Sequence, residues 1–402
     1  MEHTGGIVAD TERIEAEADE AVVIDAADEA STEESGESRG KKLDKLFRAM
    51  EKMGASDLHL KAGTPPRVRV RGALKPMAMG KMSNEKIEAL IFEIMNEDQC
   101  RKYAEHGSMD FAHQAEGGSR FRVNVFRQRG LTSMAARRIA SEIMDYKQLH
   151  LPASLSKVAD HHQGLVLVSG ITGSGKSTTI SAMIEQINRT RACHIVTLED
   201  PIEFQYTDKK AFINQREIGL DVHDFHRALK YLMRQDPDVV LIGEMRDEET
   251  FSAALHAAES GHLVFGTVHA SGVAGTITRV LELFPENARA LVRSSLVFNL
   301  QGIICQKLLK TIRPDVPRVP CVEMCLVNAT VRKFIAEGRD QELLGVVKSS
   351  YGEGMVDFNE SLRRLVEEEY IDQATAYAAA TNAEELKMKL KGINISGSGI
   401  AG

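Results

Sequence analysis

The chain has 402 residues, of which 43% are hydrophobic and 27% are charged. This length and balance predict a soluble globular protein with two domains and terminal tails. No apolar stretch approaches the length needed to cross a bilayer, and no signal peptide precedes the first domain, so the composition excludes a membrane-spanning protein.

The acidity of the chain is concentrated at its N-terminus. Residues 1–40 contain 13 Asp and Glu against 2 Lys and Arg, and removing this contribution from the net charge of −8 leaves +3 for the remainder. A nearly neutral remainder argues against a nucleic-acid-coating protein. The 5 cysteines are widely spread and odd in number, which predicts a reducing compartment without a disulfide framework.

Residues 1–40 combine many acidic and small residues with few large apolar ones. Such a segment buries too little surface to offset its chain entropy, so we expect a disordered acidic tail. The alternative is a partner-binding segment with a transient helix around residues 14–24.

Residues 41–145 predict a small α+β domain. Apolar residues at helical spacing end at Gly54, and the alternation of valine and arginine at 67–72 predicts a strand with one solvated face. Ser83 is a candidate helix N-cap. The remaining elements expected here are strands near 109–113, 120–126 and 133–139 and helices at 86–95 and 97–103.

Residues 146–156 are interpreted as a linker, and residues 157–391 alternate strand and helix patterns. This alternation predicts a doubly wound parallel sheet, followed by a helical last third and a flexible tail at 392–402. The expected strands are 165–168, 194–198, 239–242 and 263–267, and the expected helices include 176–188, 224–234, 248–260, 274–283, 288–298, 331–337, 359–369 and 383–391.

A phosphate-binding loop follows the first of these strands. Gly170, Gly175, Lys176 and Ser177 fill the spacing G-x-x-x-x-G-K-[ST] between an apolar strand and a helix, whereas a plain glycine-rich turn is the alternative. Glycines let backbone N–H groups approach a phosphate, and the helix N-terminus favours its charge. We expect Lys176 to reach the β- and γ-phosphates and Ser177 to ligate Mg²⁺. The predicted nucleotide-binding residues are Gly170, Thr172, Gly173, Ser174, Gly175, Lys176, Ser177 and Thr178.

Ionisable residues follow three other strands, and in open α/β sheets such strand ends form the ligand site. Glu244 stands where hydrolytic enzymes keep a carboxylate, and we expect it to orient the attacking water. Glu199 adds negative charge, and Asp200 is either an indirect Mg²⁺ ligand or a helix cap or salt-bridge partner. His269 is a candidate γ-phosphate sensor or a structural histidine.

Hydrolysis in phosphate-binding-loop enzymes is accelerated by roughly 10³–10⁵ when an arginine reaches the transition state. Arg234, Arg246 and Arg279 of the second domain are candidates for this arginine. The first domain offers a row of its own, which is otherwise a solvated face: Arg120, Arg122, Arg127, Arg129, Arg137 and Arg138.

Four ordered stretches resemble the Walker A, Asp, Walker B and His boxes of the PilT/PilU-type retraction motors, a branch of the secretion ATPases. They are residues 170–178, 197–203, 236–247 and 261–270, and residues 54–60 with Pro65 and Pro66 resemble the family's N-terminal domain. The resemblance covers roughly residues 41–390.

The resemblance implies a PAS-like first domain, a RecA-like second domain and a homohexameric ring that hydrolyses ATP with Mg²⁺. It also implies arginine fingers at Arg122 and Arg137, with Arg129 as a further candidate. Glu199, Glu244, His262 and His269 fall on box positions. The implied partner is the inner-membrane platform of a type IV pilus, and the implied location is cytoplasmic, at the inner face of the bacterial inner membrane. No four-cysteine metal element is found, which favours retraction over assembly.

Two departures leave alternatives open. The acidic tail is outside the family pattern, and residues 329–335 differ from the family's Ala-Ile-Arg motif while keeping Arg332. A PilU-like accessory working beside a paralogous retraction ATPase, or a related assembly or secretion ATPase, is therefore an alternative. A nucleic-acid translocase and a weakly hydrolysing regulator are further alternatives, and no nucleic-acid partner is expected.

Overall fold

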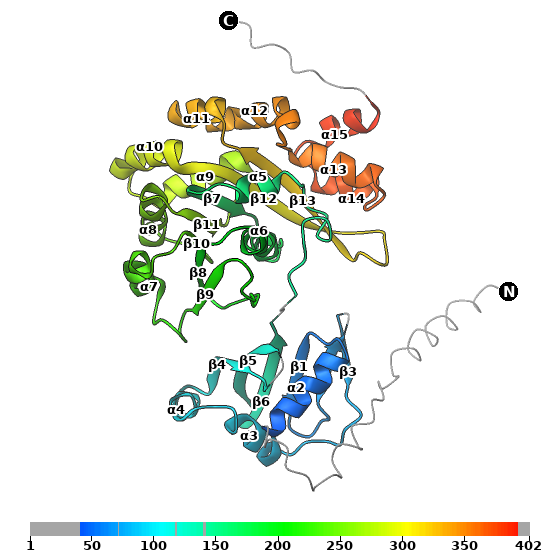
Figure 1. Ribbon diagram of the computed structural model, residues 1–402. Helices are drawn as coiled ribbons and strands as arrows, with labels where there is room; N and C mark the ends of the chain where they lie inside the picture. The colour runs from blue at the N-terminus through cyan, green and yellow to red at the C-terminus, as the bar shows by residue number, and fades with distance from the viewer. Residues whose placement is uncertain (1–40, 71, 117–118, 140–141, 393–402) are drawn as a thin grey trace, which may run out of the picture. The chain divides into compact units, whose positions relative to one another are not determined.

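The computed structural model describes residues 41–392 apart from residues 71, 117–118 and 140–141. The predictions for residues 1–40 and for most of 392–402 therefore lie outside the described part. The chain forms two compact units that divide between Ser141 and Glu142, and each is described by itself (Figure 1). Among the described residues, no helix is long and apolar enough to span a membrane.

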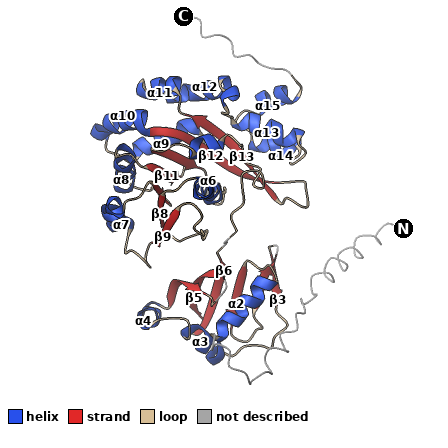
Figure 2. Ribbon diagram, viewed as in Figure 1, coloured by secondary structure: helices blue, strands red, loops and turns tan. Residues whose placement is uncertain are grey.

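The first unit is an antiparallel sheet with helices packed against it (Figure 2). Its strand order is β3-β2-β1-β6-β5-β4, and every pairing is antiparallel. The strands are β1 Asp57–Lys61, β2 Arg67–Val70, β3 Ala73–Pro76, β4 Ser108–Gln114, β5 Arg120–Gln128 and β6 Leu131–Arg138, and the helices are α2 Lys42–Lys52, α3 Asn84–Phe92 and α4 Glu97–His106.

The core of this unit lies between the helices and one face of the sheet. Phe47 of α2 stacks on Phe121 of β5 with ring centroids 4.1 Å apart, and both side chains are fully buried. The side chain of Ser83 accepts a hydrogen bond from the backbone N–H of Lys86, which confirms the predicted cap of α3. Each predicted element of this unit is present, whereas the strands β1 and β3 were not predicted.

The second unit is built on a seven-stranded sheet in the order β13-β12-β7-β11-β10-β8-β9. All neighbouring strands are parallel except β12 and β13, which form an antiparallel pair. The strands are β7 Gly164–Ser169, β8 His194–Glu199, β9 Phe212–Glu217, β10 Val239–Ile242, β11 Leu263–Val268, β12 Leu300–Lys310 and β13 Arg318–Leu326.

Helices cover both faces of this sheet because its central strands are apolar on both sides. Along β7, Leu165 and Leu167 join one core cluster, whereas Val166 and Val168 join the cluster on the opposite face. The second cluster contains α5 Leu155–Ala159 and α6 Lys176–Thr190. The helices of the first cluster are α7 Phe225–Leu232, α8 Glu248–Glu259, α9 Val273–Glu282, α10 Arg289–Asn299, α11 Ala329–Ala336, α12 Leu343–Ser349, α13 Phe358–Glu367, α14 Gln373–Ala379 and α15 Ala383–Leu390.

Two expectations for this unit were wrong. The last third of the chain is not all helical, since β12 and β13 extend the sheet and make it mixed rather than purely parallel. Residues 146–156 are not a free linker, because Tyr146 and Leu149 pack on the core beside α6 and Leu151 and Leu155 are buried there. The sequence also did not predict β9.

Candidate nucleotide-binding site

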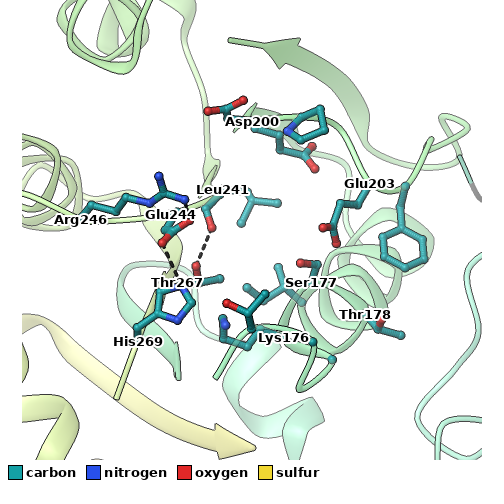
Figure 3. A pocket seen from close by; sticks show the side chains of 18 of the residues that line it. Lys176, Ser177, Thr178, Asp200, Glu203, Leu241, Glu244, Arg246, Thr267 and His269 are labelled. Atoms are coloured by element: carbon teal, nitrogen blue, oxygen red, sulfur yellow. Dashed lines mark hydrogen bonds and ion pairs between the residues drawn. The ribbon is translucent and has the colours of Figure 1, made fainter. Parts of the chain in front are cut away.

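A cavity of about 540 Å³ lies at the carboxyl-terminal edge of the parallel strands (Figure 3). Its walls come from the loop after β7 and from the segments that follow β8, β10 and β11. Of the predicted site residues it brings together Thr172, Gly173, Gly175, Lys176, Ser177, Thr178, Glu199, Asp200, Glu244 and His269.

The phosphate-binding loop is packed tightly against β12. A Cβ added to Gly170 would lie 2.5 Å from the backbone oxygen of Gln306, and a Cβ on Gly175 would lie 2.8 Å from its Nε2. Gly170 and Gly175 have φ angles of 150° and 89°, which L side chains rarely adopt. The hydroxyl of Thr179 donates to Gln306 Oε1 at 2.6 Å. The loop therefore requires glycine at both positions, because Gln306 of β12 packs directly against it.

Lys176 is the first residue of α6, and its side chain turns back over the loop. Its Nζ donates to the backbone oxygens of Gly170 and Ile171 at 2.9 and 3.1 Å. Burial lowers the pKa of Lys176, and the carboxylates of Glu244 and Glu203 oppose that shift. Both carboxylates thus act electrostatically on the lysine within one cavity.

Glu244, beyond the end of β10, is held through both of its oxygens. Arg246 donates to Oε2 at 2.5 Å, and His269 Nε2 lies 2.9 Å from Oε1. The hydrogen bond from Arg246 is the main reason that the pKa of Glu244 is lowered, and His269 adds to the shift. Glu244 is therefore a carboxylate with a fixed orientation at neutral pH.

Glu199, the last residue of β8, is in a different environment. Its side chain is buried, the Thr197 hydroxyl donates to Oε1 at 2.7 Å, and Gln215 Nε2 lies 3.3 Å away. Burial raises the pKa of Glu199 in spite of these hydrogen bonds. The pKa of Glu199 is thus raised, whereas that of Glu244 is lowered.

Five other predicted site residues are not among those that line this cavity: Gly170, Ser174, His262, Arg122 and Arg137. His262 precedes β11, whereas the cavity is at the other end of that strand, and His262 Nδ1 lies 2.9 Å from the backbone oxygen of Ala257. His262 does not line this cavity, and the role implied for it by its box position stays a prediction. Arg122 and Arg137 belong to the first unit, where β5 and β6 place them directly opposite each other. Arg137 Nε donates to Asp57 Oδ1 at 2.8 Å.

Gly170 and Ser174 shape the loop without lining the cavity. The Ser174 hydroxyl oxygen is buried and has no hydrogen-bond partner among the described residues.

Two residues of the site were not singled out from the sequence. Glu203 lines the cavity, and its carboxylate points toward Ser177 in Figure 3. It ends the stretch 197–203 quoted for the resemblance, and that position was the available signal. Gln306 had no such signal, because its role depends on β12 lying beside β7.

A second cavity of about 420 Å³ adjoins the loop. Gly175 and Thr178 line both cavities. The charged residues of its wall are Asp315 and Arg318. Apolar side chains form much of the rest of the wall: Met144, Leu149, Leu151, Leu308, Val316, Pro317 and Pro320.

A glycine-rich loop between a buried strand and a helix, at the carboxyl edge of a largely parallel sheet, defines a RecA-like phosphate-binding-loop protein. Residues 33–386 match the family model described as Type II/IV secretion system protein, so the chain belongs to this family.

Several relatives are similar over most of their length. The type IV pilus retraction ATPase PilT of Pseudomonas aeruginosa is 40% identical over 83% of this chain and 96% of its own, and PilU of the same species is 38% identical over 87% and 91%. A crystal structure of the pilus retraction motor PilT with bound ADP matches with a TM-score of 0.80 at 40% identity, over 86% of this chain and 99% of that one. The ATPase DotB of Legionella pneumophila matches with a TM-score of 0.69 at 26% identity, over 86% and 97%.

Proposed function

We propose that this protein is an ATPase motor that drives type IV pilus retraction. The observation that carries the proposal is the meeting of Lys176, Glu244 and His269 in one cavity at the phosphate-binding loop. The similarity to PilT over most of both chains supports the assignment to retraction.

In this proposal the two cavities bind different parts of the nucleotide. The first, lined by Lys176 and loop backbone, takes the phosphates, and the second takes the nucleoside end because it is apolar and adjoins the loop at Thr178. The PilT structure that matches this fold contains ADP.

The donor set of the first cavity fits Mg²⁺. The Ser177 hydroxyl and the carboxylates of Asp200 and Glu203 supply the oxygen ligands that this ion prefers, directly or through water. When bound, the ion neutralises charge on the phosphate oxygens.

The acidities of the glutamates suggest their roles. Glu244 stays ionised because Arg246 and His269 stabilise its charge, so it accepts a hydrogen bond from the attacking water and orients it. Glu199 has a raised pKa and is the poorer acceptor of the two. Lys176 holds positive charge beside the transferred phosphate.

The family resemblance implies that Arg122 and Arg137 of a neighbouring copy supply further positive charge to the transition state. It also implies that the working form is a homohexamer. In this proposal the motor acts from the cytoplasm on the inner-membrane pilus platform, where a paralogous ATPase is a further partner. The 38% identity with PilU keeps a PilU-like accessory role as the second candidate.

Deleting the gene tests this assignment. Cells that keep surface pili and lose twitching motility would support a retraction motor, and cells that lose pili altogether would contradict it. Restoration by the wild-type chain and failure of restoration by Lys176→Ala would connect the phenotype to nucleotide turnover.

A further inference from the structure

The outer face of the first sheet carries a row of basic side chains. Arg67 and Arg69 flank the buried Val68 on β2, and Arg120 and Arg122 flank the buried Phe121 on β5, so these arginines point away from the core. Cross-strand pairing places Arg137 of β6 on the same face. The basic residues of this arginine face are Lys61, Arg67, Arg69, Arg120, Arg122 and Arg137, and its acidic residues are Asp57 and Asp110.

The register brings like charges together on this face. Arg122 and Arg137 are directly opposed across β5 and β6, an arrangement that destabilises a sheet when nothing compensates it. Asp57 is paired in register with Arg69 on one side and Arg137 on the other, and its carboxylate lies 3.8 and 2.8 Å from their Nε atoms. One carboxylate shared by two arginines leaves a positive excess. The Arg137 side chain is also 71% exposed.

The same unit is joined to a segment of opposite charge. Residues 1–40, with 13 acidic and 2 basic side chains, connect through Lys41 to α2. An unconstrained chain of 40 residues spans about 35 Å, whereas a domain of about 100 residues has a radius of gyration of about 13 Å. The segment can therefore reach any part of the surface of this unit.

We propose that the acidic segment 1–40 docks on the arginine face of its own chain and competes there with other anions. Many weak ion pairs favour this docking, and the covalent connection raises the effective concentration of the segment. The consequence for turnover rests on the proposed function: while the segment covers Arg122 and Arg137, these arginines are withheld from nucleotide. The N-terminal segment then acts as a brake that a partner or salt releases.

Zero-length carbodiimide cross-linking of the full chain tests the docking, because it joins a carboxylate to a lysine amine only in direct contact. Lys61 reports on the arginine face, and Lys86, exposed on α3 at the helix-covered side, is the matched control. We expect cross-links from residues 1–40 to Lys61 at monomer mass, about tenfold weaker in 0.5 M than in 0.05 M NaCl because salt screens exposed charges. Equal labelling of Lys61 and Lys86, absence of cross-links, or cross-links found only between two copies would overturn docking within one chain.

A full-length variant with the 13 carboxylates of residues 1–40 changed to amides tests the brake. It should lose the cross-links to Lys61 and turn over ATP several-fold faster than wild type at low salt, with equal rates at high salt. Equal rates at low salt would overturn the brake. Arg137→Ala separates the two proposals: if it leaves wild-type turnover unchanged, the proposed role of that arginine in hydrolysis fails, whereas the cross-linking result stands by itself.

Discussion

Arg246 donates a hydrogen bond to Glu244 at 2.5 Å from a position only two residues further along the chain. The arginine side chain is 74% exposed and the glutamate side chain 23% exposed, so the pair lies at the mouth of the cavity. His269 approaches the other carboxylate oxygen, so Arg246 and His269 together fix the plane of the carboxylate. The orientation of the proposed base is thus set by its immediate neighbours.

Arg246→Ala should lower kcat by about 10- to 100-fold, because a misoriented carboxylate no longer aligns the attacking water. The affinity for a non-hydrolysable ATP analogue should change little, since Arg246 contacts Glu244 rather than the loop. Steady-state kinetics and equilibrium binding measure the two quantities. Arg246→Lys should restore part of the rate, and Arg101→Ala, which removes an exposed arginine paired with Asp98, should leave it unchanged. A loss of affinity with normal kcat would contradict a positioning role.

The pH dependence of turnover should report the same contact. The pKa of Glu244 is lowered mainly by Arg246, so the base stays ionised to a lower pH than a free glutamate, and kcat should decline only below the ordinary carboxylate range. In Arg246→Ala the pKa rises, and the acid limb of the kcat profile should shift to higher pH. An acid limb at the same pH in both proteins would assign that limb to another group.

The sequence predicted most of this site because its signals are local. The loop at 170–178 combines fixed spacing with a flanking strand and helix, and Glu244 and His269 directly follow apolar strands, so their convergence follows from parallel topology. The acidity difference between Glu199 and Glu244 was not predictable, because it depends on burial and on Thr197 and Arg246 at particular distances.

The prediction failed where residues depend on distant neighbours. The run around Ile303 is apolar on both faces, and periodicity alone does not separate such a strand from a buried helix. For the same reason Gln306 was overlooked, since its contact with the loop requires β12 to lie next to β7. The segment at 146–156 has the composition of a linker, and only the core beside α6 explains why Leu151 is buried.

Gly170→Ala should disable nucleotide binding. The added Cβ would meet the Gln306 backbone oxygen and the Ser174 hydroxyl oxygen, each at 2.5 Å, at a φ of 150°. Relieving such an overlap costs about 1–3 kcal/mol and moves the loop. Titration with a fluorescent ATP analogue and thermal unfolding measure the effects. Gly275→Ala is the matched control, because nothing lies within 4 Å of that Cβ in α9, and it should stabilise the fold by about 0.5–1 kcal/mol. Wild-type nucleotide affinity in Gly170→Ala would show that the loop tolerates the shift.

Glu323→Gln should stabilise the second unit at neutral and higher pH. Glu323 is buried on β13, and its Oε1 accepts a hydrogen bond from the backbone N–H of Val273 at 2.8 Å. Burial is the main cause of its raised pKa, so the folded state binds the proton more tightly than the unfolded chain. Stability contributed by the protonated form is therefore present below the ordinary glutamate pKa of about 4.3 and is lost as pH rises through the folded pKa.

A glutamine keeps the acceptor for Val273 and cannot ionise. The thermal midpoint of Glu323→Gln should exceed that of wild type at pH 8, and the difference should disappear toward pH 4. Glu282→Gln, which alters an exposed carboxylate at the other end of α9, should show a much smaller dependence on pH. A lower midpoint of Glu323→Gln across the whole range would mean that the ionised carboxylate, interacting with Val273 and the start of α13, stabilises the fold more than its burial costs.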